Sequence, residues 1–347
     1  MSGEERTDSR KNSFRHIDSF MVAPVETSSC GKPATAAVER PWGVYRWWVY
    51  QRERFPVLPN GLLILTFSSS AVCYSALLRN DVIFPSLLVL LTAFLTCFFF
   101  FLQLRIADEF KDFDEDAQYR PYRAVPRGLV RLGELRNIWL ISASLQFILA
   151  LWLEPKLALW VLLVTLYLAL MTREFFARDW LKARPITYML SHMMICPLID
   201  FFATACDWAR FGNPPAGLGW FILASYFNGI VWEVGRKIRA PSQEEPGVET
   251  YTAMWGIPRA VGAWLLALIS TACFILLAAW KIDFFLPVLM VAGALLLLAS
   301  AYSFVFIRKR SNKLAKGFEA ASGVWTLFMY LMLGIVPFVI RHLGAQP

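Results

Sequence analysis

Six carboxylates lie within nine consecutive positions of the sequence, residues 108–116. Asp108, Asp112 and Asp116 are spaced four apart, so on a helix their side chains share one face, with Glu109 beside it. Stacked carboxylates repel one another unless a cation lies among them, and Lys111 is not on that face. A set of oxygen ligands favours Mg²⁺. We therefore predict that these four acids bind Mg²⁺ and that the three aspartates are catalytic.

Three arginines, Arg120, Arg123 and Arg127, follow the acidic cluster. Guanidinium groups bind phosphate oxygens through paired hydrogen bonds, so these arginines are predicted to bind a diphosphate. The simpler alternative is a solvated loop in which acids and bases pair. We favour the site because the acids start within four residues of the apolar run 82–104, and charges at a helix mouth are costly unless they are used.

A second polar stretch, residues 227–256, continues an apolar segment into a basic patch. Glu233 is the acid best placed to complete the metal site and to act in catalysis, and Lys237 and Arg239 are predicted to bind the diphosphate. A Glu233–Lys237 salt bridge at spacing i, i+4 is the alternative. Asn228 is a candidate metal ligand or an interhelical hydrogen-bonding residue.

The elements that position these residues are predicted to be membrane helices. The chain of 347 residues is 57% hydrophobic and 17% charged, with a mean hydropathy of +0.48, so a bilayer is its expected solvent. We predict an all-α membrane protein of about nine transmembrane helices. The apolar segments cover residues 59–78, 82–104, 137–153, 157–172, 186–205, 217–235, 260–280, 284–306 and 321–340.

Basic residues alternate between the loops. The loops after segments 2, 4, 6 and 8 carry 20 Lys and Arg, and the loops after segments 1, 3, 5 and 7 carry 4. This pattern predicts that the N-terminus and the basic loops face the cytosol. The acidic cluster follows segment 2 and the second polar stretch follows segment 6, so we expect them to form two parts of one site. The net charge of +8 is explained by this topology and does not suggest nucleic acid.

Three regions are predicted along the chain. Residues 1–44 are expected to be a disordered polar tail that lacks the apolar stretch of a secretory signal peptide, residues 45–340 a transmembrane domain, and residues 341–347 a short C-terminal tail. We expect a multi-pass protein of the endoplasmic reticulum or another internal membrane, if the organism is eukaryotic. The scattered cysteines and histidines indicate neither disulfides nor zinc.

The sequence resembles the UbiA superfamily of intramembrane prenyltransferases over about residues 45–340. The stretch 108–116, DEFKDFDED, is similar to the family's first acidic motif, and RPYRAVPRG at 120–128 is similar to the segment that follows it. GVETYTAMWG at 247–256 resembles the segment that follows the second motif. The second motif itself departs from the family pattern, because Glu233 and a basic run stand where several aspartates are usual.

The resemblance implies nine helices, motif loops after helices 2 and 6, Mg²⁺ and a prenyl diphosphate substrate. Ionisation of the substrate releases diphosphate and leaves an allylic cation. The cation is then captured by its own double bonds in a terpene cyclase, or by an aromatic or other acceptor in a prenyltransferase. The altered second motif and, with less weight, the 28 Phe, 14 Trp and 11 Tyr favour a cyclase, with farnesyl diphosphate as the expected substrate.

Three further features are left with two interpretations each. Asp200, eight residues after His192, is either catalytic or a helix-packing residue. Arg173 and Glu174 either contact the diphosphate or form an interfacial pair. The acids as a whole could form an ion pathway in a transporter, but such a protein should carry ionisable residues along several mid-membrane helices.

Overall fold

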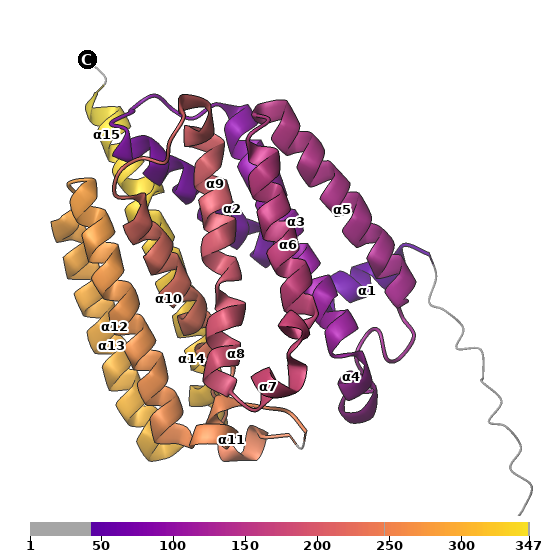
Figure 1. Cartoon of the computed structure of the whole chain (residues 1–347). Helices are drawn as coiled ribbons and strands as arrows, with labels where there is room; N and C mark the ends of the chain where they lie inside the picture. The colour runs from indigo at the N-terminus through magenta and orange to yellow at the C-terminus, as the bar shows by residue number, and fades with distance from the viewer. Residues whose placement is uncertain (1–42, 246, 346–347) are drawn as a thin grey trace, which may run out of the picture. The chain divides into compact units, whose positions relative to one another are not determined.

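The computed structural model describes residues 43–245 and 247–345, and this part of the chain is helical without strands (Figure 1). Seven stretches are long and apolar enough to cross a membrane. They comprise α2 (Val57–Leu78), α3 (Leu87–Lys111), α5 (Leu132–Leu153), the pair α8 (Pro185–Met193) and α9 (Ile195–Trp208) with the 3₁₀ turn after it, α12 (Ile257–Lys281), α13 (Phe285–Lys309), and the pair α14 (Asn312–Leu333) and α15 (Ile335–Gly344).

The two remaining predicted segments are also helices. The segment at 157–172 is α6 (Leu157–Thr172), which is apolar but only 16 residues long. The segment at 217–235 is α10 (Leu218–Arg236), which carries the buried polar residues Asn228 and Glu233. The prediction of an all-α membrane protein is therefore confirmed. The predicted N-terminal tail lies outside the described residues except for residues 43 and 44, and α15 extends into the predicted C-terminal tail.

Two of the predicted segments are each divided into two helices. Helix α8 ends at Met193 and α14 ends at Leu333, and in both cases a proline, Pro197 or Pro337, stands four residues later. A proline clashes with the carbonyl group four residues before it and cannot donate to that group, which breaks the helix there. Gly334 occupies the second break, where a Cβ atom would lie 2.4 Å from Cα of Ser70.

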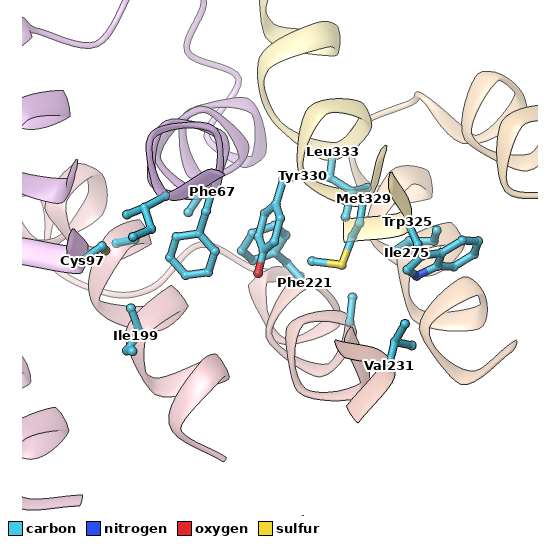
Figure 2. Close-up of a cluster of buried hydrophobic side chains, with 14 of the residues drawn as sticks. Phe67, Cys97, Ile199, Phe221, Val231, Ile275, Trp325, Met329, Tyr330 and Leu333 are labelled. Atoms are coloured by element: carbon cyan, nitrogen blue, oxygen red, sulfur yellow. The ribbon is translucent and has the colours of Figure 1, made fainter. Parts of the chain in front are cut away.

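The long helices pack around one large hydrophobic core, in which the most extensive contacts join α10 to α12, α2 to α9 and α3 to α5. Aromatic side chains fill its centre, and Figure 2 shows Tyr330 between Phe67 and Phe221. The short helices α4 (Phe113–Tyr119), α7 (Arg178–Lys182) and α11 (Tyr251–Trp255) lie at the lower end of the bundle in Figure 1. Both predicted motif loops run through this end.

Candidate active site

The first acidic motif straddles the end of α3. Asp108 and Glu109 belong to its last turns, Asp112 lies between α3 and α4, and Asp116 lies in α4. The backbone hydrogen bonds from Asp112 N to Asp108 O (2.9 Å) and from Asp116 N to Asp112 O (2.8 Å) keep the helical spacing. However, Asp112 has φ −95° and ψ 9°, so the motif is not one continuous helix. The four acids consequently face different surroundings.

Two of the four acids are buried and paired with arginines of the chain itself. Glu109 accepts a hydrogen bond from Arg54 of α1 (Tyr45–Arg54), the short helix before α2. Asp116 accepts a hydrogen bond of 2.6 Å from Arg123, and Arg120 lies 3.4 Å away. These contacts neutralise Glu109 and Asp116 without a metal ion.

The other two acids, Asp108 and Asp112, have no close ion-pair partner among the described residues, and we call them the open acids. The Asp108 side chain is 40% exposed, and the nearest arginine nitrogen that pairs with it, on Arg105, is 3.7 Å away. Burial raises the pKa of Asp112; Lys111 opposes this shift and the charge of Asp108 reinforces it. A carboxyl group under such repulsion gains most from a bound cation.

Lys111, the cation inside the motif, is directed toward α8. Its ammonium group donates a hydrogen bond to the Tyr188 hydroxyl and lies 3.9 Å from Glu174 Oε1. The Tyr188 ring in turn stacks on His192, with ring centroids 3.9 Å apart. These contacts hold the positive charge of Lys111 at the edge of the open acids Asp108 and Asp112.

Glu174 is placed by a strained turn at the end of α6. Glu174, Phe175 and Phe176 have φ values of 48°, 53° and 58°. A left-handed conformation costs a residue other than glycine about 1–2 kcal/mol, and such strain concentrates at functional sites. The buried Glu174 carboxylate forms ion pairs with Lys111 and Arg178, and not with the neighbouring Arg173.

The second motif is compact and carries net positive charge. Glu233 is buried, lies 2.9 Å from the ammonium group of Lys237, and accepts a hydrogen bond of 2.7 Å from Arg236 Nε. Lys237 also lies 5.5 Å from the centre of the Tyr251 ring. The salt-bridge interpretation of Glu233 and Lys237 therefore describes their geometry, with Arg236 as a further cation.

Two other residues of this stretch have local partners. Arg239 donates its backbone N–H to Thr252 Oγ1 (3.0 Å), and its side chain borders a surface groove with Lys316 and Glu319. Asn228 Oδ1 accepts a hydrogen bond of 3.2 Å from the Thr326 hydroxyl on α14. Of its two predicted roles, this is the hydrogen bond between helices.

Charges of both motifs act on common neighbours: Asp108, Lys111 and Glu233 act on the His192 ring, and Asp108 also acts on Arg236. That the loops after segments 2 and 6 form two parts of one site stays a prediction.

The residues present fit a magnesium ion that is held by two carboxylates and completed by water and substrate oxygens. Among the described residues, no three His, Cys, Asp or Glu side chains converge on one point. Mg²⁺ in phosphate-binding sites, however, needs only one or two carboxylates, because water and substrate oxygens complete its shell. Asp108 and Asp112 supply such a pair, whereas the predicted ligands Glu109, Asp116 and Glu233 are held by arginine or lysine side chains.

Several residues around these acids were not predicted from the sequence. Arg54 is separated from Glu109 by 55 positions, and Lys111 from Tyr188 by 77, so no local spacing connects them. The arginines predicted to bind diphosphate also have protein partners: Arg120 and Arg123 contact Asp116, and Arg127 pairs with Glu53 at 2.9 Å.

Comparison with known proteins decides the family. A family model described as the UbiA prenyltransferase family matches residues 62–331. The chain belongs to this family. The UbiA match spans both acidic motifs and the helices between them.

Two solved structures are similar to this UbiA-family chain. One is the apo structure of a UbiA homologue from Aeropyrum pernix K1, at 12% identity and a TM-score of 0.60, with 80% of this chain and 97% of that chain covered. The other is described as a study of digeranylgeranylglyceryl phosphate synthase in membranes, at 14% identity and a TM-score of 0.52, with 85% and 99% covered. No curated protein matches the sequence.

Proposed function

We propose that this protein is an intramembrane enzyme that uses Mg²⁺ to ionise a prenyl diphosphate and cyclises the resulting cation to a terpene hydrocarbon. The observation that supports this most is the pair of open carboxylates, Asp108 and Asp112, next to a second motif that presents Arg236 and Lys237. Open acids suit a metal ion and clustered cations suit phosphate oxygens. Farnesyl diphosphate is the proposed substrate.

The roles of the residues follow from their charges. Asp108 and Asp112 would hold Mg²⁺, which would supply positive charge to stabilise the departing diphosphate. Lys111 and Lys237 attract the phosphate oxygens as the carbon–oxygen bond breaks and the diphosphate leaves with the electron pair. The bilayer-embedded helices exclude water from the allylic cation, which would otherwise be captured as an alcohol.

The second motif favours cyclisation over transfer. In this chain Glu233 is already neutralised by Arg236 and Lys237, so this part of the site offers cations and no free acid. Prenyl transfer to an acceptor is the second candidate function. It is supported by the family description, and by the similar structure described as digeranylgeranylglyceryl phosphate synthase. We also propose that the motif loops face the cytosol of an internal membrane, as the basic loops indicate.

Product analysis tests this proposal. Membranes that contain the protein are incubated with Mg²⁺ and farnesyl diphosphate without acceptor, and the organic extract is analysed. We expect a cyclic hydrocarbon that is absent from control membranes. A substrate that stays intact until a phenolic acceptor or a longer prenyl chain is supplied would reject the cyclase in favour of a prenyltransferase.

Charge reversal at Lys237 should weaken substrate binding. Lys237→Glu places a second carboxylate beside the buried Glu233 and removes a cation from the phosphate region, so we expect the KM for farnesyl diphosphate to rise about tenfold or more. Lys313→Glu, an exposed lysine on α14, has the same charge change and should leave KM unchanged. Equal KM values for the two variants would refute the assigned role of Lys237.

A further inference from the structure

Asp200 is a carboxylate buried deep in the helix bundle, away from both motifs. It lies on α9 with 0% exposure, among residues of the large hydrophobic core. Tyr188, His192, Cys196 and Asp200 follow one another at four-residue spacing, from the contact with Lys111 toward the interior. Eight residues of helix correspond to about 12 Å, so Asp200 lies roughly that far below His192. A prenyl chain whose diphosphate is held at the motifs would reach this depth.

The polar partners of the Asp200 carboxylate are two hydroxyl groups, those of Tyr330 and Ser225. Its Oδ2 atom accepts a hydrogen bond of 2.7 Å from the Tyr330 hydroxyl on α14. Within the described part of the chain, Oδ1 forms no hydrogen bond of standard geometry, but the Ser225 hydroxyl is close enough to act as a second donor to the carboxylate. A carboxyl group with so few polar partners is costly in an apolar bundle. Ionisable residues inside membrane segments are rare and are usually retained for function.

Aromatic rings pack around Tyr330, the residue that donates a hydrogen bond to this carboxylate. The Tyr330 ring contacts Phe67 and Phe221, with centroids 4.8 Å and 6.0 Å away (Figure 2). Tyr74 stacks on Phe221, with centroids 4.7 Å apart. Faces of aromatic rings attract cations. The region therefore combines groups that stabilise a carbocation with one oxygen atom that can accept a proton.

We propose that Asp200 is the base that ends the reaction, an inference that rests on the proposed cyclase function. A C–H bond next to the cationic carbon breaks, its electron pair forms the new carbon–carbon double bond, and Oδ1 of Asp200 takes the proton. The positive charge of the hydrocarbon is thereby discharged, and no oxidant or reductant is required. Tyr330 is a positioning residue, because its hydroxyl fixes Oδ2 of the carboxylate.

The variant Asp200→Asn tests this role. Asparagine has the same shape and can still accept the hydrogen bond from Tyr330, but it is not a base. We expect Mg²⁺-dependent release of diphosphate from farnesyl diphosphate to stay within about threefold of the wild type. The wild-type hydrocarbon should fall by about 10²-fold, the usual contribution of a general base, and be replaced by alcohols or other alkenes. Asp207→Asn, a buried acid on α9 paired with Arg79, is the matched control and should keep the product unchanged.

The possible outcomes separate the two proposals. Wild-type protein that releases no diphosphate contradicts the proposed function. The role of Asp200 alone is overturned if the Asp200→Asn variant releases diphosphate normally and still makes the wild-type hydrocarbon. It is also overturned if this variant loses diphosphate release and thermal stability together. If Asp200→Asn does not insert into membranes, Tyr330→Phe serves as the second variant. It keeps the Asp200 carboxylate but removes the hydroxyl that fixes its orientation. A broader product mixture therefore supports the proposal, and an unchanged mixture contradicts it.

Discussion

Replacement of Asp112 by alanine is expected to lower diphosphate release from farnesyl diphosphate by about 10³-fold or more, because it removes half of the open carboxylate pair that holds Mg²⁺. The protein should still insert and fold, since Asp112 forms no ion pair of its own among the described residues. The measurement is the initial rate of diphosphate release in membranes as a function of Mg²⁺ concentration.

Asp114→Ala provides the matched control. Asp114 lies two positions further along the same acidic run, but its side chain is exposed at the start of α4. This variant should keep the wild-type rate and the wild-type Mg²⁺ dependence. Full activity of Asp112→Ala, or an equal loss in both variants, would show that Asp112 has no specific role in metal binding.

Replacement of Arg54 by alanine is expected to destabilise the protein by up to about 3–5 kcal/mol, because the buried Glu109 loses its closest partner and keeps only Arg105, at 3.6 Å. The side chains of Arg54 and Glu109 are 9% and 1% exposed, so water cannot take the place of the guanidinium group. The midpoint of thermal unfolding in detergent measures this effect. Arg52→Ala, an exposed arginine on the same helix, should leave the midpoint nearly unchanged.

A double variant separates this structural role from metal binding. Arg54→Met combined with Glu109→Gln removes both charges, and we expect it to recover most of the lost stability. If Glu109 instead binds Mg²⁺, as the motif spacing predicted, the double variant would require far more Mg²⁺ than the wild type. A single Arg54→Ala variant with wild-type stability would contradict the assignment of Arg54 as the partner of Glu109.

Hydropathy and length were sufficient to predict every long helix of the bundle, because a helix in a bilayer must be apolar along its whole length. The breaks before Pro197 and Pro337 were not predicted, although each proline stands four residues after a helix end. The short helix α1 was not predicted, because it is rich in charged residues and only Tyr50 of its side chains is fully buried.

The site was predictable only in part. Four-residue spacing predicted a helical backbone through Asp108 and Asp112, which lie at the end of α3, but it could not show that Glu109 pairs with Arg54. Partners so far apart in the sequence are determined by tertiary packing. The turn that directs Glu174 toward Lys111 has no local signal either, because it contains none of the glycines that usually mark positive φ.

Mg²⁺-dependent diphosphate release is the measurement that tests the central claim most directly. Purified protein in lipid is supplied with geranyl, farnesyl or geranylgeranyl diphosphate without acceptor, and inorganic diphosphate is followed over time. We predict release that requires Mg²⁺, is highest with farnesyl diphosphate and disappears in Asp112→Ala. Release that persists in chelator, or that is the same in the variant, would contradict ionisation of a prenyl diphosphate at Asp108 and Asp112.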